Sequence, residues 1–432
     1  MTSKSTEPQQ AYVWIWLPGS AEPVVAGLLN AQGDRLVFNY GRSYLERESA
    51  IPIYAPELPL KRGELPLLPG MSMPSCLRDA SPDAWGRRVI INRKFGRTHQ
   101  GEGVSELTYL LESGSDRIGA LDFQASPTEY VPRTARQAGL DELLRAAELV
   151  EQGIPLTPEL EQALNHGTSI GGARPKALIE EGERKWIAKF SAGTDAYSVV
   201  KAEFLAMRLA RLCGLSVADV RMVRSGKKDV LLVERFDRTK TDSTWLRHLM
   251  VSALTLMELD EMFARHASYE TLAELIRARF SEPKHTLREL FGRIVFNILC
   301  GNTDDHARNH SAFWDGQSLS LTPAYDICPQ NRTGGEATQA MLIQGSDRMS
   351  RISSCLNAAS LFLLTESEAI AIVMGQILVI NQHWADVCEE GEVSTVDQNL
   401  FWGRQFLNPF AFEDLTGAWS EIGDLAGSVR QR

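Results

Sequence analysis

Paired cysteines are absent from this sequence of 432 residues. No two of its six cysteines have the CxxC spacing that zinc sites and redox motifs require. The sequence therefore predicts neither a zinc site nor a disulfide framework. We expect free thiols, several of them buried among apolar neighbours. The six are Cys76, Cys213, Cys300, Cys328, Cys355 and Cys388.

Long apolar runs are also scarce. The longest, residues 369–380, is too short to cross a bilayer and follows Glu366 and Glu368, so it predicts a buried helix. Residues 1–10 are polar and lack the apolar core of a signal peptide. We therefore expect a cytoplasmic protein that makes no contact with a membrane.

An excess of basic residues is missing as well. Lysine and arginine total 45 against 55 aspartates and glutamates, which gives a formal net charge of -10. A protein that binds duplex DNA alone normally carries a basic face, because affinity depends on neutralised phosphates. DNA is therefore expected to be contacted only indirectly, through a partner. One basic cluster predicts a solvated helix face or, as the alternative, a contact surface: Arg87, Arg88, Arg93, Lys94 and Arg97.

The hydrophobic pattern changes along the chain, and the length predicts two or three packed units. Alternating apolar runs predict antiparallel strands at residues 12–17, 24–29 and 36–40. Later periodicities predict helices at 140–151 and 158–166 and strands at 177–180, 186–190 and 230–234. The pattern after about residue 245 is almost wholly helical. The expected organisation is a β-rich unit at residues 1–115, an α/β unit at 116–245 and a helical unit at 246–432.

The strongest chemical signal is the segment Gly301–Asn309. It follows an apolar helix that Gly301 is placed to end. Asp304 and Asn309 have the D-x-x-x-x-N spacing of a kinase catalytic loop, in which a carboxylate deprotonates the attacking hydroxyl and an amide oxygen holds Mg²⁺. Asp305 directly follows Asp304, so the choice of base depends on the spacing to Asn309. A solvated loop rich in Asp and Asn is the alternative.

A predicted β-hairpin follows this loop. Residues 311–314 and 318–321 flank an Asp-Gly turn, and Tyr325 and Asp326 come just beyond. A catalytic loop, a hairpin and a metal-binding aspartate occur in this order in kinase-type phosphotransferases. The order therefore predicts that Asp326 is a second Mg²⁺ ligand.

Lys189 and Glu203 form a second candidate pair. Lys189 lies on a predicted strand, opposite the face that carries Trp186, Ala188 and Phe190. Glu203 falls within an apolar stripe of a helix predicted at residues 198–213. A buried carboxylate needs a cationic partner, and a strand lysine paired with a helix glutamate holds ATP phosphates in kinases. Alternatively, Glu203 lies at the edge of the stripe.

Two weaker motifs flank this pair. Ser169–Lys176 contains Gly171 and Gly172, which allow backbone N–H groups to approach phosphates, although an ordinary turn explains them too. Leu231–Arg238 predicts a strand that ends in a loop and offers backbone groups to adenine. A strand end followed by a charged turn is equally compatible with it.

Together these segments resemble the nucleotide-binding motifs of the HipA family of serine/threonine kinases. In order they are residues 169–176, 186–190, 233–238, 301–309 and 323–326. Residues 82–88 and 116–121 resemble the N-terminal motifs of that family. The resemblance implies an α+β, protein kinase-like (PI3/4-kinase-like) fold of two lobes, with a β-rich N-terminal subdomain and a helical C-terminal lobe.

The resemblance also implies roles and partners. Asp304 is the implied catalytic residue, Asn309 and Asp326 the Mg²⁺ ligands, and Ser169 the autophosphorylation site, with Thr168 as the competing acceptor. The implied ATP-binding residues are Gly171, Gly172, Ala173, Lys176, Lys189, Glu203, Glu234, Phe236, His306, Asn309 and Tyr325. The implied partners are a HipB-like helix-turn-helix antitoxin and a protein substrate such as an aminoacyl-tRNA synthetase, whose phosphorylation arrests growth. Arg174 and Pro175 depart from the Gln-Glu of some members.

Two other functions are compatible with parts of the pattern. A small-molecule kinase of the aminoglycoside type shares the D-x-x-x-x-N loop, but it does not explain the β-rich N-terminal unit or Ser169. A non-catalytic corepressor with a kinase fold is the second, and the full set of candidate catalytic residues argues against it.

Overall fold

The computed structural model describes residues 7–95, 103–134, 138–164, 172, 174–191, 195, 197–226, 228–242, 244–332 and 335–431. It divides the chain into two compact units, and the chain passes between them several times. Unit 1 comprises Met1–Ala192, Val223–Val251 and Phe313–Gln317, and unit 2 comprises Gly193–Met222, Ser252–Ala312 and Ser318–Arg432. The predicted division at residues 115 and 245 stays a prediction.

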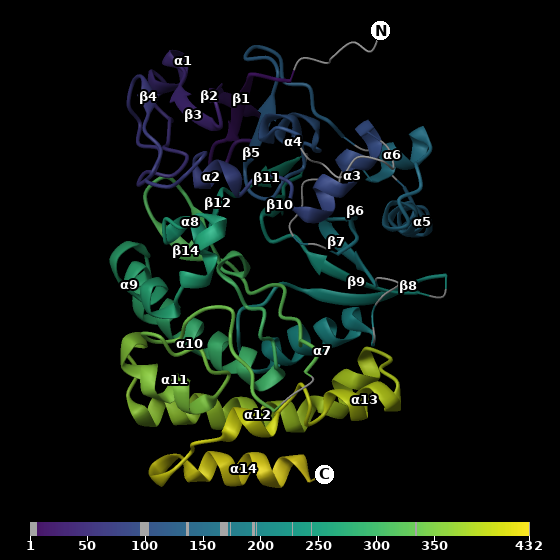
Figure 1. The fold of residues 1–432 in the computed structure, drawn as a ribbon, viewed down its shortest axis with the longest axis vertical. Helices are drawn as coiled ribbons and strands as arrows, with labels where there is room; N and C mark the ends of the chain where they lie inside the picture. The colour runs from purple at the N-terminus through teal and green to yellow at the C-terminus, as the bar shows by residue number, and fades with distance from the viewer. Residues whose placement is uncertain are drawn as a thin grey trace. The chain divides into compact units, whose positions relative to one another are not determined.

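Unit 1 begins with a five-stranded sheet in the order β4-β3-β2-β1-β5 (Figure 1). All four strand pairs are antiparallel, which confirms the predicted sheet. Gly27 allows two strands to pack tightly, because a Cβ there would lie 2.6 Å from the ring of Phe38. The strands are β1 (Gln10–Trp16), β2 (Pro23–Gln32), β3 (Arg35–Tyr40), β4 (Glu64–Leu65) and β5 (Leu121–Gln124).

A second sheet of four strands has the order β6-β7-β9-β8. One of its faces packs on helices α5 and α6 and on Trp85 of α3, so unit 1 has an apolar core here. The strands are β6 (Lys176–Glu181), β7 (Arg184–Phe190), β8 (Val220–Ser225) and β9 (Lys228–Glu234), and a hairpin of β10 (Arg238–Lys240) and β11 (Trp245–Arg247) follows. The strands predicted at 177–180, 186–190 and 230–234 are confirmed.

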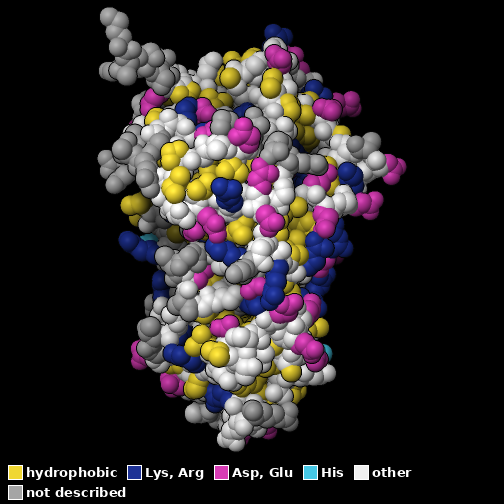
Figure 2. Space-filling model, turned by 90° about the vertical axis from the view of Figure 1, so that its right-hand side faces the viewer, with side chains coloured by type: hydrophobic (Ala, Val, Ile, Leu, Met, Phe, Trp, Pro, Cys, Tyr) yellow, Lys and Arg dark blue, Asp and Glu magenta, His cyan; other side chains and the backbone are white. Residues whose placement is uncertain are grey.

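Ion pairs neutralise much of the basic cluster on α3. Arg87 lies 2.7 Å from Glu106, Arg93 lies 2.8 Å from Glu112, and Lys94 also pairs with Glu112. Arg97 lies outside the described residues. On the face drawn in Figure 2, acidic side chains occur among the basic ones. The helices of unit 1 are α1 (Arg42–Leu45), α2 (Ser75–Arg78), α3 (Ala84–Phe95), α4 (Glu106–Glu112), α5 (Leu140–Glu151) and α6 (Pro158–Leu164).

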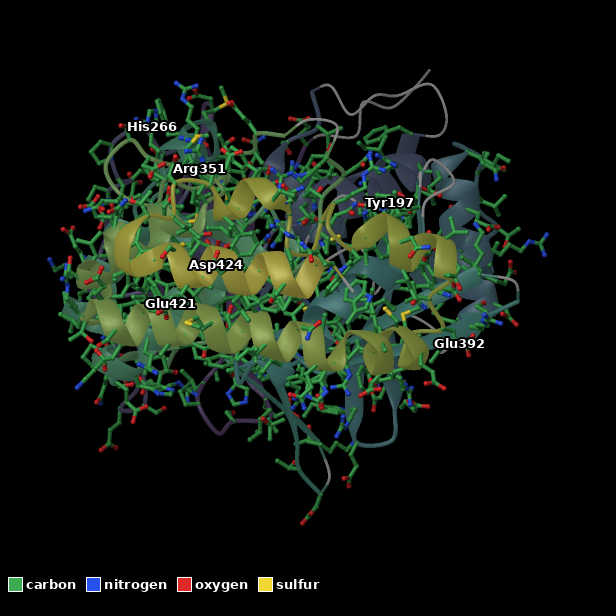
Figure 3. All side chains as sticks on the ribbon, turned by 90° about the horizontal axis from the view of Figure 1, so that it is seen from below. Tyr197, His266, Arg351, Glu392, Glu421 and Asp424 are labelled. Carbon is green, nitrogen blue, oxygen red and sulfur yellow. The ribbon has the colours of Figure 1, made fainter. Side chains whose placement is uncertain are left out.

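Unit 2 is mainly helical, as predicted for the C-terminal part. The helix α12 starts with a capping box formed by Thr365 and Glu368, and α14 lies alongside it (Figures 1 and 3). The α-helices are α7 (Val199–Leu212), α8 (Ala253–Leu256), α9 (Tyr269–Arg279), α10 (Pro283–Cys300), α11 (Ile352–Ala358), α12 (Glu366–Glu390), α13 (Thr395–Phe401) and α14 (Ser420–Arg430).

Short 3-10 helices connect these elements, and three short strands lie where the chain passes between the units. Thr322 donates its N–H to the carbonyl of Ser311, and β13 pairs with β14, so the predicted hairpin is confirmed. The 3-10 helices are η2 (Glu261–His266), η3 (Ala307–Asn309), η4 (Ala359–Phe362), η5 (Pro409–Phe412) and η6 (Gly417–Trp419), and the strands are β12 (Met250–Ser252), β13 (Ser311–Trp314) and β14 (Leu319–Leu321).

Two further expectations concern cysteines and membranes. All six cysteines are free thiols, which confirms that they form no disulfide framework. None of the helices in the described ranges has the length and apolarity needed to span a bilayer.

Gly301 ends α10 in the left-handed conformation, with φ at 71°, and so confirms the predicted helix end. A Cβ at this position would lie 2.8 Å from the carbonyl oxygen of Gln405. Gly417 has a similar φ of 61° but open space around it. Both glycines therefore have a left-handed backbone, but of the two only Gly301 is closely packed against a neighbouring segment.

We predict that Gly301→Ala lowers the free energy of unfolding more than Gly417→Ala does. The shared left-handed conformation costs an alanine about 1–2 kcal/mol, and the clash at Gly301 adds about 1–3 kcal/mol. Urea unfolding of both variants measures the difference. Equal losses would contradict the close packing of Gly301 against Gln405.

Candidate active site

The loop that carries Asp304 is held to the rest of unit 2 by its backbone. Gln330 donates its N–H to the carbonyl of Gly301 at 3.0 Å, and Ala340 donates to the carbonyl of Thr303, also at 3.0 Å. Asn302 donates its N–H to the carbonyl of Asn297 in α10. These bonds hold the loop between the end of α10 and the segment that follows Asp326.

Asp305 points into the protein and is 3% exposed. Its Oδ2 accepts hydrogen bonds from the Asn297 amide at 2.7 Å and from the Tyr269 hydroxyl, and it lies 2.9 Å from Nε2 of His310. Burial alone would raise the pKa of Asp305, but His310 and the Tyr269 hydrogen bond hold it below its usual value. Asp305 therefore has a structural role in fixing the loop.

Asp304, one position earlier, is exposed. Among the described residues, none donates a hydrogen bond to its carboxylate. Partial desolvation raises the pKa of Asp304, and the nearby carboxylates of Asp326 and Asp305 raise it further against the opposing effect of His306. Of the two adjacent aspartates, the structure leaves only Asp304 accessible to a hydroxyl substrate.

Asn309 and Asp326 lie in the same region of unit 2. The Asn309 amide donates to the carbonyl of Asp304 at 3.3 Å, an orientation that leaves its oxygen available to a cation. Asp326 has a left-handed backbone with φ at 59°, which is costly for a non-glycine residue and frequent at functional sites. Its carboxylate lies close enough to Asp304 to affect the pKa of that residue.

This donor set fits Mg²⁺ bound together with phosphates. In the described part of the chain, no three His, Cys, Asp or Glu side chains form a metal cluster. Mg²⁺ at kinase sites typically uses one or two carboxylates and completes its coordination with substrate phosphates and water. In addition, the buried Nδ1 of His306 has no hydrogen-bond partner within the described ranges, as expected of a group that faces a polar ligand.

Tyr325 contributes to the shape of the loop. Its hydroxyl donates to the carbonyl of Arg308 at 2.7 Å and lies 2.7 Å from the Ser311 hydroxyl. Tyr325 thus joins the end of the loop to the hairpin. The predicted contact between Tyr325 and the nucleotide stays a prediction.

In unit 1 the second half of the glycine motif packs against α3. The indole of Trp85 is fully buried and donates to the carbonyl of Lys176 at 3.0 Å, while the Trp85 N–H donates to the carbonyl of Gly172. Gly172 has φ at 102°, and a Cβ there would clash with the Lys176 ammonium. Gly171, Ala173, Thr168 and Ser169 lie outside the described residues.

Lys189 occupies the predicted face of β7. Trp186, Ala188 and Phe190 are buried on one face, and Lys189 is half-buried on the other. Glu203 in unit 2 is buried, with 2% exposed, as expected. The predicted apolar stripe of α7 was too narrow, because the helix is buried on nearly every side. The Lys189–Glu203 ion pair stays a prediction.

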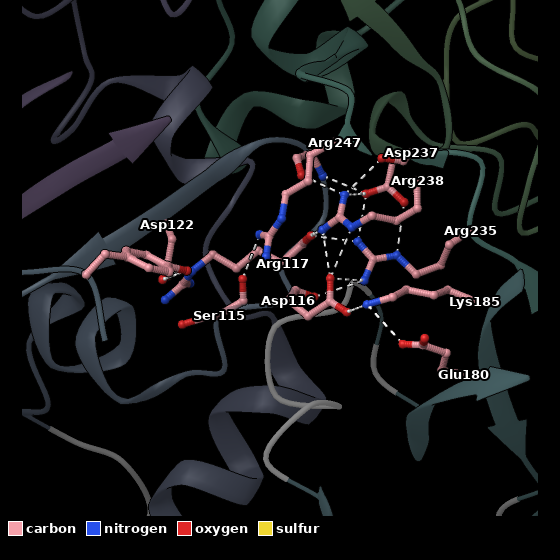
Figure 4. A network of polar contacts seen from close by, with 12 residues as sticks. Ser115, Asp116, Arg117, Asp122, Glu180, Lys185, Arg235, Asp237, Arg238 and Arg247 are labelled. Atoms are coloured by element: carbon pink, nitrogen blue, oxygen red, sulfur yellow. Dashed lines mark hydrogen bonds and ion pairs between the residues drawn. The ribbon is translucent and has the colours of Figure 1, made fainter. Parts of the chain in front are cut away.

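The chain just after Glu234, at the end of β9, is held by a buried network of ion pairs and hydrogen bonds, drawn in Figure 4. The Asp237 carboxylate accepts hydrogen bonds from Arg235 at 2.7 Å, from Arg238 at 2.9 Å and from the N–H of Gly119 at 2.8 Å. Asp116 accepts from the same two arginines at 3.0 and 2.9 Å. The motif at residues 116–121 and the motif at 233–238 therefore hold each other in place.

Lys185 joins this network from β7. Its ammonium lies 2.7 Å from Asp116, and its carbonyl accepts the N–H of Arg235. Burial by itself would raise the pKa of Asp116, but Arg235, Arg238 and Lys185 hold it well below its usual value. The network thus connects the candidate adenine segment with the strand that carries Lys189.

Successive side chains of residues 234–237 point to opposite sides of the extended chain, and this alternation determines which of them join the network. Arg235 and Asp237 are buried, while Glu234 and Phe236 are half-buried on the other side. Phe236 contacts Phe313 edge-on, with ring centroids 6.0 Å apart, and Glu234 lies 3.5 Å from Arg184. This arrangement leaves the two predicted adenine-contacting residues outside the network.

Sequence reasoning missed the parts of the site that are buried. Arg235, Asp237 and Arg238 look like a charged turn, and Trp85 is one residue of the motif at 82–88 with no sign of its own that it is buried. The one usable signal was the combination of charged residues with glycine in residues 116–121. That signal does not reveal that the two motifs bind each other.

Comparison with known proteins agrees with this fold. The family model for the HipA-like C-terminal domain matches residues 168–384, and the model for the HipA N-terminal domain matches residues 16–124. A chain of the Shewanella oneidensis toxin–antitoxin complex of HipA, HipB and operator DNA superposes with a TM-score of 0.69 at 19% identity. That match covers 98% of this chain and 97% of the other.

Curated sequences give the same result over shorter stretches. The Shewanella oneidensis serine/threonine-protein kinase toxin HipA is 30% identical over 186 residues, which cover 37% of this chain and 42% of the toxin. A Sinorhizobium fredii protein named provisionally as a kinase is 25% identical over 318 residues, covering 67% of this chain and 71% of its own length.

Fold and loop geometry place the chain in the class of α+β proteins with a protein kinase-like fold. Within this class the chain belongs to the HipA family, because the two family models together match most of its length.

We predict that Asp237→Asn lowers the free energy of unfolding at pH 7 by about 3–5 kcal/mol, because it leaves buried arginines less compensated. The pKa of Asp237 is lowered from 3.8 to about 2, chiefly by Arg235 and Arg238 against the effect of burial. Its contribution is therefore present above pH 4 and lost as the pH falls toward 2.

Urea unfolding of the wild type and of Asp237→Asn between pH 7 and pH 2.5 measures this contribution. The difference between the two curves should shrink as the pH falls below 4, because the contribution of the wild-type carboxylate is progressively lost there. A difference that stays constant over the whole range would contradict the proposed ionic role of Asp237.

Proposed function

We propose that this protein is an ATP- and Mg²⁺-dependent serine/threonine protein kinase that acts as a growth-arresting toxin. The observation that carries the proposal is the catalytic loop, in which Asp305 is buried and bonded while Asp304 is exposed beside Asp326 and Asn309. The name of the Shewanella oneidensis relative supports the serine/threonine specificity and the toxin role.

In the proposed reaction Asp304 accepts the proton of the substrate hydroxyl as the hydroxyl oxygen attacks the terminal phosphorus of ATP. The bond from that phosphorus to the bridging oxygen breaks, and ADP leaves. Asn309 and Asp326 would hold Mg²⁺, which supplies charge neutralisation to the phosphates when bound. Lys189 would pair with the phosphates, and Glu203 would orient Lys189. Glu234 and Phe236 would contact adenine, while Gly172 and Lys176, with Gly171 and Ala173, would approach the phosphates.

A pair of variants tests the assignment of the base. Asp304→Asn removes the proton acceptor and should lower phosphate transfer by at least about 100-fold, while the fold stays intact because its carboxylate makes no hydrogen bond to the described protein. Asp305→Asn should mainly lower the free energy of unfolding, because a neutral amide replaces the charged acceptor of Tyr269 and His310. The measurements are phosphate transfer from radiolabelled ATP and urea unfolding.

Near-wild-type turnover by a folded Asp304→Asn protein would contradict the base assignment. Asp326→Ala serves as the second activity variant, because it removes a proposed metal ligand without touching the base. Transfer to a small alcohol and to no protein would favour the small-molecule kinase. Absence of ATP turnover in the wild type would favour the corepressor.

The proposed protein substrate is an aminoacyl-tRNA synthetase or another translation protein. Phosphorylation of such an enzyme would stop protein synthesis and so arrest growth. This class of substrate is the one implied by the resemblance of the sequence motifs to the HipA family. Phosphoproteomics after induced expression is the direct way to identify the substrate.

Ser169 is the proposed site of self-inhibition. Its phosphate would add roughly 1.5 to 2 negative charges next to glycines that approach the ATP phosphates. We predict that the phosphorylated protein binds ATP at least about tenfold more weakly, whereas Ser169→Ala keeps its affinity after incubation with ATP and Mg²⁺. Mass spectrometry identifies the acceptor, including Thr168, and an ATP titration of each form measures affinity. Unchanged ATP affinity of the Ser169-phosphorylated form would defeat the prediction.

We also propose a HipB-like helix-turn-helix antitoxin as the partner that brings the protein to DNA. The Shewanella oneidensis structure contains such a partner and operator DNA. The net charge of -10 and the ion pairs on α3 argue against strong DNA binding by this chain alone. Fluorescence anisotropy with duplex DNA should show tight binding only with the antitoxin. Salt-sensitive nanomolar binding of DNA by the purified chain alone would contradict the proposal that the antitoxin is needed.

A further inference from the structure

One buried arginine of this chain lacks the partner that the others have. Five arginines are buried in the described ranges, and four of them pair with carboxylates: Arg117 with Asp122, Arg235 and Arg238 with Asp116 and Asp237, and Arg293 with Glu289. The fifth, Arg332, is 9% exposed and forms no ion pair within the part of the chain that the structure describes. Arg332 is therefore a buried cation without an anion.

The hydrogen bonds of Arg332 are also incomplete. Its Nη2 donates to the carbonyl of Gly335 at 2.8 Å, but its Nε and Nη1 are buried and find no partner among the described residues. Burial lowers the pKa of Arg332, and no carboxylate raises it again. Because a guanidinium stays protonated in proteins, these donors remain charged and unsatisfied without a ligand.

The neighbourhood of Arg332 offers only a weak substitute for an anion. The guanidinium carbon of Arg332 lies 5.6 Å from the centroid of the buried Phe410 ring, and that of Arg351 lies 4.6 Å from the same centroid. Arg351, labelled in Figure 3, pairs with Asp414 and Glu413 but also keeps an unpartnered Nε. A cation–π contact is weaker than an ion pair, so Phe410 offsets only part of the desolvation.

The position of Arg332 connects it with the candidate active site of the same unit. It lies six residues after Asp326 in a segment that is bonded to the catalytic loop on both sides. Gln330 precedes Arg332 and binds the carbonyl of Gly301, while Ala340 follows it and binds the carbonyl of Thr303. A ligand at Arg332 would therefore act on a segment fixed directly to the loop that carries Asp304.

We propose that Arg332 forms a binding site for a phosphate group. Phosphate supplies both the negative charge that Arg332 lacks and strong acceptor oxygens, one of which can accept a charge-assisted hydrogen bond from the free Nε or Nη1. The phosphate is either inorganic phosphate or a phosphate monoester such as a phosphorylated side chain. The inference does not depend on the proposed kinase activity.

Isothermal titration calorimetry tests the site with inorganic phosphate and with phenyl phosphate as the monoester. The titrations use the full chain in EDTA without nucleotide, to exclude binding through Mg²⁺. Arg332→Met should weaken phosphate binding by about tenfold or more, and Arg277→Met is the matched control, because Arg277 is an exposed arginine of the same unit. Binding of phenyl phosphate would identify a monoester site, and binding of inorganic phosphate alone a site for the free ion.

A stability measurement separates this proposal from a purely structural role of Arg332. In phosphate-free buffer, Arg332→Met should unfold at the same urea concentration as the wild type or at a higher one, because it removes an unpaired buried charge. Arg332→Gln is the second variant if the Met form does not fold. Equal phosphate binding by wild type and variant, no binding by the wild type, or a large loss of stability in both variants without phosphate would each overturn the proposal.

Discussion

The hydrogen bonds around the buried carboxylate of Asp305 hold the candidate catalytic loop in its shape. Tyr269 comes from the start of α9, Asn297 from α10, and His310 from the end of the loop itself. Hydrogen bonds to a charged group contribute about 1.5–3 kcal/mol each, so three of them outweigh the preference of a short polar loop for disorder. Because Asp305 turns inward, Asp304 turns outward, and the carboxylate of the proposed base accepts no hydrogen bond from the described residues.

Unit 1 also contains buried carboxylates that are held by several donors, in a larger network. Asp116 and Asp237 are surrounded by Arg235, Arg238 and Lys185, and each carboxylate has more than one donor (Figure 4). A buried charge is tolerated only when it is paired and hydrogen-bonded. The requirement for pairing links two segments more than a hundred residues apart and so fixes the strand end at Glu234. Arg332 is the exception to this pattern, and the proposed phosphate site follows from that exception.

Much of the local structure could be predicted from the sequence, because it depends on neighbours along the chain. The left-handed end of α10 at Gly301, the Asp-Gly hairpin and the outward face of Lys189 all follow from residue type and periodicity. The spacing from Asp304 to Asn309 predicts kinase-type chemistry at this loop, and that assignment stays a prediction. Asp305 could not be assigned in this way, since its inward orientation depends on Tyr269, which lies 36 residues earlier.

The features that could not be predicted depend on distant partners. A charged turn such as residues 235–238 is normally solvated, and only the fold brings Asp116 and Gly119 to it. Trp85 likewise gains its role from Lys176, which lies 91 positions further along the chain. The sequence places Glu203 within a narrow apolar stripe of α7, yet the helix is buried on nearly every side and Lys201 is buried as well. The periodicity of the sequence indicates which residues share a face of a helix or strand, but it does not indicate which other elements cover that face.

The most direct test of the central claim is a crystal structure of the protein with Mg²⁺ and a non-hydrolysable ATP analogue. We expect the Asn309 amide oxygen and the Asp326 carboxylate to bind the metal and Lys189 to contact a phosphate. We also expect the Asp304 carboxylate to face the terminal phosphate while Asp305 keeps its bonds to Tyr269 and His310. A nucleotide bound elsewhere, or a metal held by Asp305 in place of Asp326, would contradict these expectations.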